Sequence, residues 1–155
     1  MSDQHKWQKR FIELARHIAT WSKDPSTQTG CVIVDHRRSI VSTGYNGFPR
    51  GVDDAAARLA DRPTKYAYTV HCEANAILDA AARGIPLAGC SIYINGAPCV
   101  ECMKSIIQAG ITSVAWPKNN PFESDPTTNA RWAESLQMAE VMAREAGVRV
   151  LRIEP

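Results

Sequence analysis

The sequence predicts an α/β protein with three layers (α/β/α), in which a mixed five-stranded sheet lies between helices. Three observations lead to this class. A helical apolar stripe opens the chain, and two short apolar runs separated by a polar turn follow it. The second half then alternates apolar runs with helical stripes that end at glycine. At 155 residues, the chain is expected to form a single domain over positions 1–155.

The first expected element is an amphipathic helix, because apolar residues recur at steps of three and four. The stripe consists of Trp7, Phe11, Leu14, Ala15, Ile18 and Trp21, and it ends before Asp24-Pro25. Cys31–Val34 is then a short apolar run, residues 35–39 are a polar turn, and Ile40–Tyr45 is a second run. These runs predict two strands paired as an antiparallel hairpin.

A long connection follows over Asn46–Thr69. It contains two glycines and two prolines, and its composition predicts at most a short helix around Asp53–Ala60. Connections of this length in a compact domain are usually functional.

From residue 70 onward, strands and helices alternate. Helices are expected at Ala74–Ala81, from Pro98 to Gly110, and at Asn129–Ala146, with Gly84 and Gly147 as stops for the first and last. Strands are expected at Cys90–Ile94, Thr112–Trp116 and Val148–Ile153, with a polar loop over Pro117–Pro126. This βαβαβ order requires parallel strands joined by right-handed crossovers.

Composition excludes several classes of protein. No apolar run approaches the roughly 20 residues that span a bilayer, and the start of the chain is polar, without the apolar core of a signal peptide. A net charge of +2 requires no nucleic-acid partner. Five cysteines, an odd number, argue against a disulfide framework and predict a reducing, cytoplasmic location with metal or catalytic use for some thiols.

Two segments carry recognisable chemistry, His71-Cys72-Glu73 and Pro98-Cys99-Val100-Glu101-Cys102. Cys99 and Cys102 are three residues apart at a helix start, where the helix dipole favours thiolates. Two thiolates and one imidazole make three ligands for Zn²⁺ and leave a fourth position open, as in catalytic zinc sites. Glu73 then remains free to transfer protons.

Two other interpretations of the cysteines are a redox dithiol and a structural zinc site with four cysteines. Against the second, Cys31 and Cys90 each fall in an expected strand, where a small buried residue fits well. The combination H-x-E with P-C-x-x-C is the known signature of the zinc-dependent nucleobase deaminases.

The chain also resembles the deoxycytidylate (dCMP) deaminase family beyond the zinc motifs, over roughly residues 6–116. The similar stretches are Ser22–Gly30, Gly44–Gly51 with Asp53-Asp54, Lys65–Ile77 and Ile106–Ile111. This resemblance implies a cytidine-deaminase-like fold, with His71, Cys99 and Cys102 as zinc ligands and Glu73 as the proton shuttle. It also implies that Asn46 contacts the sugar and that backbone groups near Cys72 and Ala97 hold the pyrimidine.

The chain departs from the family pattern at two places. Cys72 stands where the family usually has alanine, and Asn95-Gly96-Ala97 precedes Pro98 where relatives often carry a bulkier residue. The phosphate of a nucleotide requires a cationic partner. We expect Lys118 and Arg131 in that role because ligands bind at the carboxyl ends of the strands in open α/β sheets.

The resemblance further implies a homo-oligomer, typically a hexamer, that dCTP activates and dTTP inhibits, each bound with Mg²⁺ outside the active site. The Ser22–Gly30 and Gly44–Gly51 stretches are the expected effector site. Lys23, Tyr45, Gly47 and Arg50 are its candidate residues.

The expected function is hydrolytic deamination of dCMP to dUMP and ammonia, which supplies dUMP for thymidylate synthesis. The alternatives are another cytosine nucleotide or nucleoside deaminase and a tRNA adenosine deaminase, which would be expected to show a more basic surface. A non-enzymatic alternative is a zinc-stabilised binding module, which would have no use for Glu73.

Overall fold

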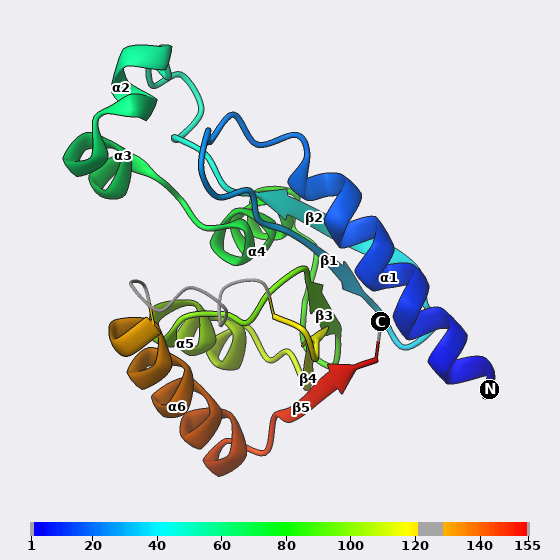
Figure 1. The fold of residues 1–155 in the computed structure, drawn as a ribbon. Helices are drawn as coiled ribbons and strands as arrows, with labels where there is room; N and C mark the ends of the chain where they lie inside the picture. The colour runs from blue at the N-terminus through cyan, green and yellow to red at the C-terminus, as the bar shows by residue number, and fades with distance from the viewer. Residues whose placement is uncertain (1, 121–128, 155) are drawn as a thin grey trace.

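The computed structural model describes the backbone of residues 2–120 and 129–154, and the side chains of 2–120 and 132–154. The helices are α1 (Asp3–Ala19), α2 (Ala56–Ala60), α3 (Arg62–Tyr68), α4 (Cys72–Ala82), α5 (Val100–Gln108) and α6 (Asn129–Glu145). The strands are β1 (Gly30–Val34), β2 (Ile40–Tyr45), β3 (Ser91–Ile94), β4 (Ser113–Pro117) and β5 (Arg149–Ile153) (Figure 1).

The strands form one mixed sheet in the order β2-β1-β3-β4-β5. β1 is antiparallel to both β2 and β3, whereas β3, β4 and β5 run parallel to one another. The predicted hairpin and the predicted parallel βαβαβ half are therefore both confirmed, and they are joined where β1 pairs with β3.

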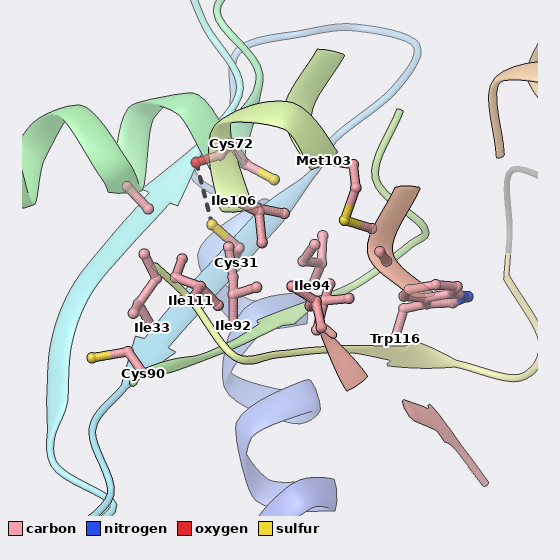
Figure 2. Close-up of a cluster of buried hydrophobic side chains, with 14 of the residues drawn as sticks. Cys31, Ile33, Cys72, Cys90, Ile92, Ile94, Met103, Ile106, Ile111 and Trp116 are labelled. Carbon is pink, nitrogen blue, oxygen red and sulfur yellow. Dashed lines mark hydrogen bonds between the residues drawn. The ribbon is translucent and has the colours of Figure 1, made fainter. Parts of the chain in front are cut away.

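Helices cover both faces of this sheet, which confirms the three-layer prediction. One face packs against α1 through a cluster that includes Phe11, Ile18, Val32, Val34 and Tyr93. The other face packs against α4, α5 and α6 through a larger cluster, which Figure 2 shows around Ile33, Ile92, Ile94, Met103 and Trp116. The alternation of Val32 and Ile33 between the two clusters is the two-residue period of a strand that is buried on both sides.

Two glycines set the spacing between these layers. A Cβ atom on Gly44 of β2 would lie 2.2 Å from the carbonyl oxygen of Cys72 in α4. A Cβ atom on Gly30 of β1 would lie 2.4 Å from the carbonyl oxygen of Ala15 in α1. Both helices therefore contact the hairpin backbone directly, one on each face.

The connection between β2 and α4 contains more helix than predicted. Besides α2, it holds α3, for which the side chain of Asp61 accepts a hydrogen bond from the amide of Thr64 at the N-terminus. Pro63 lies in the first turn of α3, where its missing N–H and fixed φ are compatible with a helix. Interpreting this proline only as a loop residue was wrong.

The first helix is also displaced from the prediction. It begins at Asp3 because the Ser2 hydroxyl accepts from the amide of His5, and it ends at Ala19 rather than at Trp21. Trp21 lies beyond the helix, half exposed, with its ring edge-on to Tyr45. The predicted loop over Pro117–Pro126 falls mostly outside the described residues. Within the described residues, no helix has the length and apolarity required to cross a membrane.

Candidate active site

Three predicted ligands meet where the N-termini of α4 and α5 come together. His71 is the N-cap residue of α4, Cys99 is the N-cap residue of α5, and Cys102 lies in the first turn of α5. The Nδ1 atom of His71 is 3.5 Å from the Cys99 sulfur and 3.4 Å from the Cys102 sulfur. All three ligand atoms lie within 4.8 Å of one another.

This spacing fits a zinc ion. Tetrahedral zinc with Zn–S near 2.3 Å and Zn–N near 2.0 Å holds sulfur and nitrogen about 3.6 Å apart. The two observed S···N distances are close to that value. Two thiolates and one imidazole are also a donor set typical of zinc, and as three protein ligands they correspond to a catalytic rather than a closed structural site.

The two cysteine ligands shift each other's pKa in opposite directions. A hydrogen bond from the Cys102 thiol, together with the neighbouring His71, lowers the pKa of Cys99 to about 4. The same interaction raises the pKa of Cys102, because the proton between the two sulfurs stays there. The backbone amide of Cys102 also donates to the Cys99 sulfur at 3.5 Å. The pKa of Cys99 is thus lowered by its neighbours, in keeping with its expected role as a thiolate ligand.

Glu73 lies in the first turn of α4, two residues after His71, and its side chain is buried. Burial raises the pKa of its carboxyl group. A buried carboxyl group with a raised pKa is suited to accept and return protons near neutral pH. Its position beside the three donors is the one that the sequence motif predicts for a proton shuttle.

Cys72 is fully buried, and its thiol is 3.3 Å from a carboxyl oxygen of Glu73. Its carbonyl oxygen accepts a hydrogen bond from the Cys31 thiol at 3.2 Å, which Figure 2 shows as a dashed line. Cys31 and Cys90 are buried in the same apolar cluster as Cys72, and all five cysteines are free. The metal cluster does not include Cys72, Cys31 or Cys90.

Asn46 follows β2, and its side chain forms hydrogen bonds to the loop between α1 and β1. Its amide nitrogen donates to the carbonyl of Thr27 at 2.9 Å, and its side-chain oxygen accepts from the amide of Thr29 at 2.8 Å. Asn95, directly after β3, donates to the carbonyl of Gln28 in the same loop and accepts from the amide of Gly30 at the start of β1. Asn46 therefore has a structural role here, and its predicted contact with the sugar stays a prediction.

A buried ion pair holds the other end of that loop. Lys65 of α3 donates to Asp24 at 3.1 Å and also to the hydroxyl of Ser26. Asp24 in turn accepts from the amides of Ser26 and Thr27. Nothing in the local sequence around Lys65 indicates that its ammonium group is buried.

A cavity of about 130 Å³ lies beside this loop. Of the candidate effector residues, Lys23, Tyr45 and Gly47 line it, together with Asn46, and Arg50 is not among the lining residues. Lys23 forms an exposed ion pair with Asp54 across the cavity at 2.8 Å. The structure thus brings together three of the four residues that were predicted for an effector site.

The remaining predicted contacts are placed as follows. Ala97 is buried on the connection between β3 and α5, directly before Pro98. Lys118 follows β4 and forms an ion pair with Glu154 after β5. Arg131 lies in α6, and its side chain is outside the described part of the chain.

The fold, the three donors and the buried glutamate define the class of metal-dependent deaminases that carries the H-x-E and P-C-x-x-C motifs. The family model for the cytidine and deoxycytidylate deaminase zinc-binding region matches residues 5–117, and the chain belongs to this family. It is 45% identical over 145 residues to an uncharacterized deaminase of the luxG 3′ region of Aliivibrio fischeri, covering 94% of this chain and 92% of that protein.

Deoxycytidylate deaminase of Mus musculus is 41% identical over 134 residues, covering 83% of this chain and 74% of that protein. The fold matches the dCMP deaminase of cyanophage S-TIM5 with a TM-score of 0.71, over 98% of this chain and 99% of that one, at 22% identity. A second structure of the phage enzyme, also with a TM-score of 0.71, is a complex with dCMP and dUMP.

Proposed function

We propose that this chain converts dCMP and water to dUMP and ammonia, with one zinc ion per chain. The observation that carries the proposal is the buried Glu73 in the first turn of α4, the helix whose N-cap residue His71 meets Cys99 and Cys102. The choice of dCMP is supported by the mouse relative, which is named a deoxycytidylate deaminase, and by the phage enzyme of the same fold that was solved with dCMP and dUMP.

A zinc ion held by these donors would supply the Lewis acidity that makes hydroxide available near neutral pH. Glu73 takes a proton from the attacking water and delivers it to the ring nitrogen N3 while the new C4–O bond forms. It then transfers the second proton to the amino group, the C4–N bond breaks, and ammonia leaves. The oxygen of water remains as the C4 carbonyl of dUMP.

Substrate positioning belongs to the same proposal. The side-chain amide of Asn46 makes two hydrogen bonds to the loop and has a further donor and acceptor position. In this proposal, one of these further positions contacts the sugar. Backbone groups at Cys72 and Ala97 hold the pyrimidine edge, and Lys118 and Arg131 bind the phosphate. Lys118 must exchange Glu154 for the phosphate when substrate binds, because the two form an ion pair in this structure.

Regulation is proposed at the cavity lined by Lys23, Tyr45 and Gly47, where dCTP with Mg²⁺ activates and dTTP inhibits. For Arg50, which does not line the cavity, the effector-binding role rests on the family resemblance alone. Lys23→Ala is expected to lower the ratio of rates measured with and without dCTP, whereas Lys6→Ala on the exposed part of α1 serves as the matched control. A homo-oligomer, a hexamer by resemblance, a cytoplasmic location and supply of dUMP for thymidylate synthesis complete the proposal.

The first test is ammonia release from dCMP, CMP, deoxycytidine, cytidine and an adenosine-containing tRNA, each with and without dCTP or dTTP. We expect dCMP to be the preferred substrate. Turnover of the tRNA alone would replace the proposed function by its nearest alternative.

The second test removes the proton shuttle without removing the metal donors. Glu73→Gln is expected to retain one zinc per chain while turnover falls by roughly 10²–10⁴-fold. Glu101→Gln makes the same chemical change on an exposed carboxylate in the first turn of α5, so it is the matched control. Unchanged turnover in Glu73→Gln would refute the mechanism and favour a zinc-stabilised binding module.

A further inference from the structure

The turn that carries both cysteine ligands is held from outside by a neighbouring helix. The first amides of any α-helix lack partners within the helix. In α5, the amide of Cys102 donates to the Cys99 sulfur, and the amide of Val100, which lies between the two ligands, donates to the hydroxyl oxygen of Ser135 at 2.9 Å. Ser135 belongs to α6, 35 residues further along the chain.

The helix that carries Ser135 is firmly placed. Leu136, Ala139 and Ala143 of α6 are buried in the large apolar cluster that also contains Met103 and Ile106 of α5. Figure 1 shows α6 alongside α5. The Ser135 hydroxyl therefore extends from a helix whose apolar face packs against α5.

We infer that Ser135 is a positioning residue for the zinc ligands, an inference that rests on the proposed zinc site. The amide nitrogen of Val100 is bonded directly to the carbonyl carbon of Cys99. Holding this peptide unit fixes the backbone from which the Cys99 side chain extends, and with it the distance from the Cys99 sulfur to the ring of His71. Groups that orient metal ligands in this way commonly change metal affinity 10- to 100-fold.

The Ser135 hydroxyl as a structural cap and as a positioning residue would have different effects on the bound metal. A purely structural cap would stabilise α5 and leave the bound metal unaffected. A positioning residue also changes how firmly the two sulfurs hold the metal, so metal release is the measurement that distinguishes the roles.

The test uses the full chain, loaded with zinc, and three variants. Ser135→Ala removes the acceptor and Ser135→Thr restores a hydroxyl. Ser105→Ala removes an exposed hydroxyl on α5 and is the matched control. Alanine is the best helix former, so Ser135→Ala is expected to fold. Zinc transfer to a chromophoric chelator gives the release rate, and the absorption spectrum of the cobalt-substituted protein reports the ligand geometry.

We expect Ser135→Ala to release zinc roughly 10- to 100-fold faster than the parent and to show shifted cobalt bands, while Ser135→Thr and Ser105→Ala match the parent. Equal release rates in Ser135→Ala and the parent would overturn the inference, as would Ser135→Thr behaving like Ser135→Ala. A parent chain that binds no zinc would instead refute the proposed function itself.

Discussion

The buried ion pair between Lys65 and Asp24 allows a quantitative prediction of stability. Their side chains are only 10% and 8% exposed, and the N···O distance is 3.1 Å. At that distance and an effective dielectric constant of about 20, two unit charges attract by about 5 kcal/mol. Removing both charges from water costs several kcal/mol per ion, so the net value of the pair is much smaller than the attraction.

Lys65→Met leaves the Asp24 carboxylate buried without its counter-charge. We expect the free energy of unfolding to fall by about 3–5 kcal/mol. For a chain of 155 residues this corresponds to a drop in melting temperature of roughly 10 °C. Adding Asp24→Asn removes the unpaired charge but keeps a side-chain oxygen for the amides of Ser26 and Thr27, so the double variant should lose less than about 2 kcal/mol.

The assay is urea unfolding followed by tryptophan fluorescence, at one protein concentration and with zinc in excess. Lys104→Met is the control, because Lys104 forms only an exposed pair with Glu101 and should cost less than about 1 kcal/mol. The reasoning is refuted if Lys65→Met costs no more than Lys104→Met, or if the double variant is less stable than Lys65→Met.

The contribution of Asp24 to the free energy of unfolding depends on pH with a defined sign. Burial raises the pKa of Asp24, but the amides of Thr27 and Ser26 and the Lys65 ammonium outweigh it, so the pKa lies below its ordinary value. The stabilisation is therefore complete above the unfolded-state pKa of about 3.9 and is lost as the pH falls through the lower folded-state pKa. The stability difference between the parent and Asp24→Asn should shrink below about pH 4.

Three further predictions concern the loop, the layer spacing and the metal. Asn46→Ala removes two hydrogen bonds of 2.8 and 2.9 Å to the loop and should cost about 2–4 kcal/mol in urea unfolding. Gly44→Ala places a Cβ atom against the Cys72 carbonyl and should cost about 3 kcal/mol and reduce kcat, whereas Gly47→Ala meets no atom within 4 Å and should leave stability unchanged. Dialysis against EDTA should abolish ammonia release, and one equivalent of Zn²⁺ should restore it.

Each of these has a clear opposing result. An Asn46→Ala variant with parental stability would mean that the loop is held by its other contacts alone. Equal stability of Gly44→Ala and Gly47→Ala would show that α4 moves away from β2 at little cost. Full activity after complete removal of metal would contradict the zinc assignment.

Local sequence patterns predicted most of the fold because each pattern has a local cause. The stripe from Trp7 to Ile18 reflects the helical repeat, and Gly84 and Gly147 end helices with positive φ. Helix α3 was missed although Asp61 and Pro63 are a standard helix start, since the surrounding glycines and prolines suggested a loop. The prediction failed for α3 because its local sequence pattern was misinterpreted, and not because tertiary contacts overrode that pattern.

The candidate site likewise has residues that the sequence predicts and a contact that it does not predict. His71, Glu73, Cys99 and Cys102 were predictable because each stands at a helix N-terminus within a short motif. The contact of Ser135 with Val100 was not predictable, because it depends on how α6 packs against α5.

The two close-contact glycines of the hairpin, Gly30 and Gly44, also bear on how freely this sequence can change. Cys31 and Gly44 form one rung of the ladder, Gly30 and Tyr45 the next, and the two glycines receive helices from opposite faces. At these two positions the helices approach the backbone of the strands so closely that any side chain would displace them. In a saturation library selected for deaminase activity, Gly30 and Gly44 should therefore tolerate as little variation as the metal ligands, although neither belongs to the metal site.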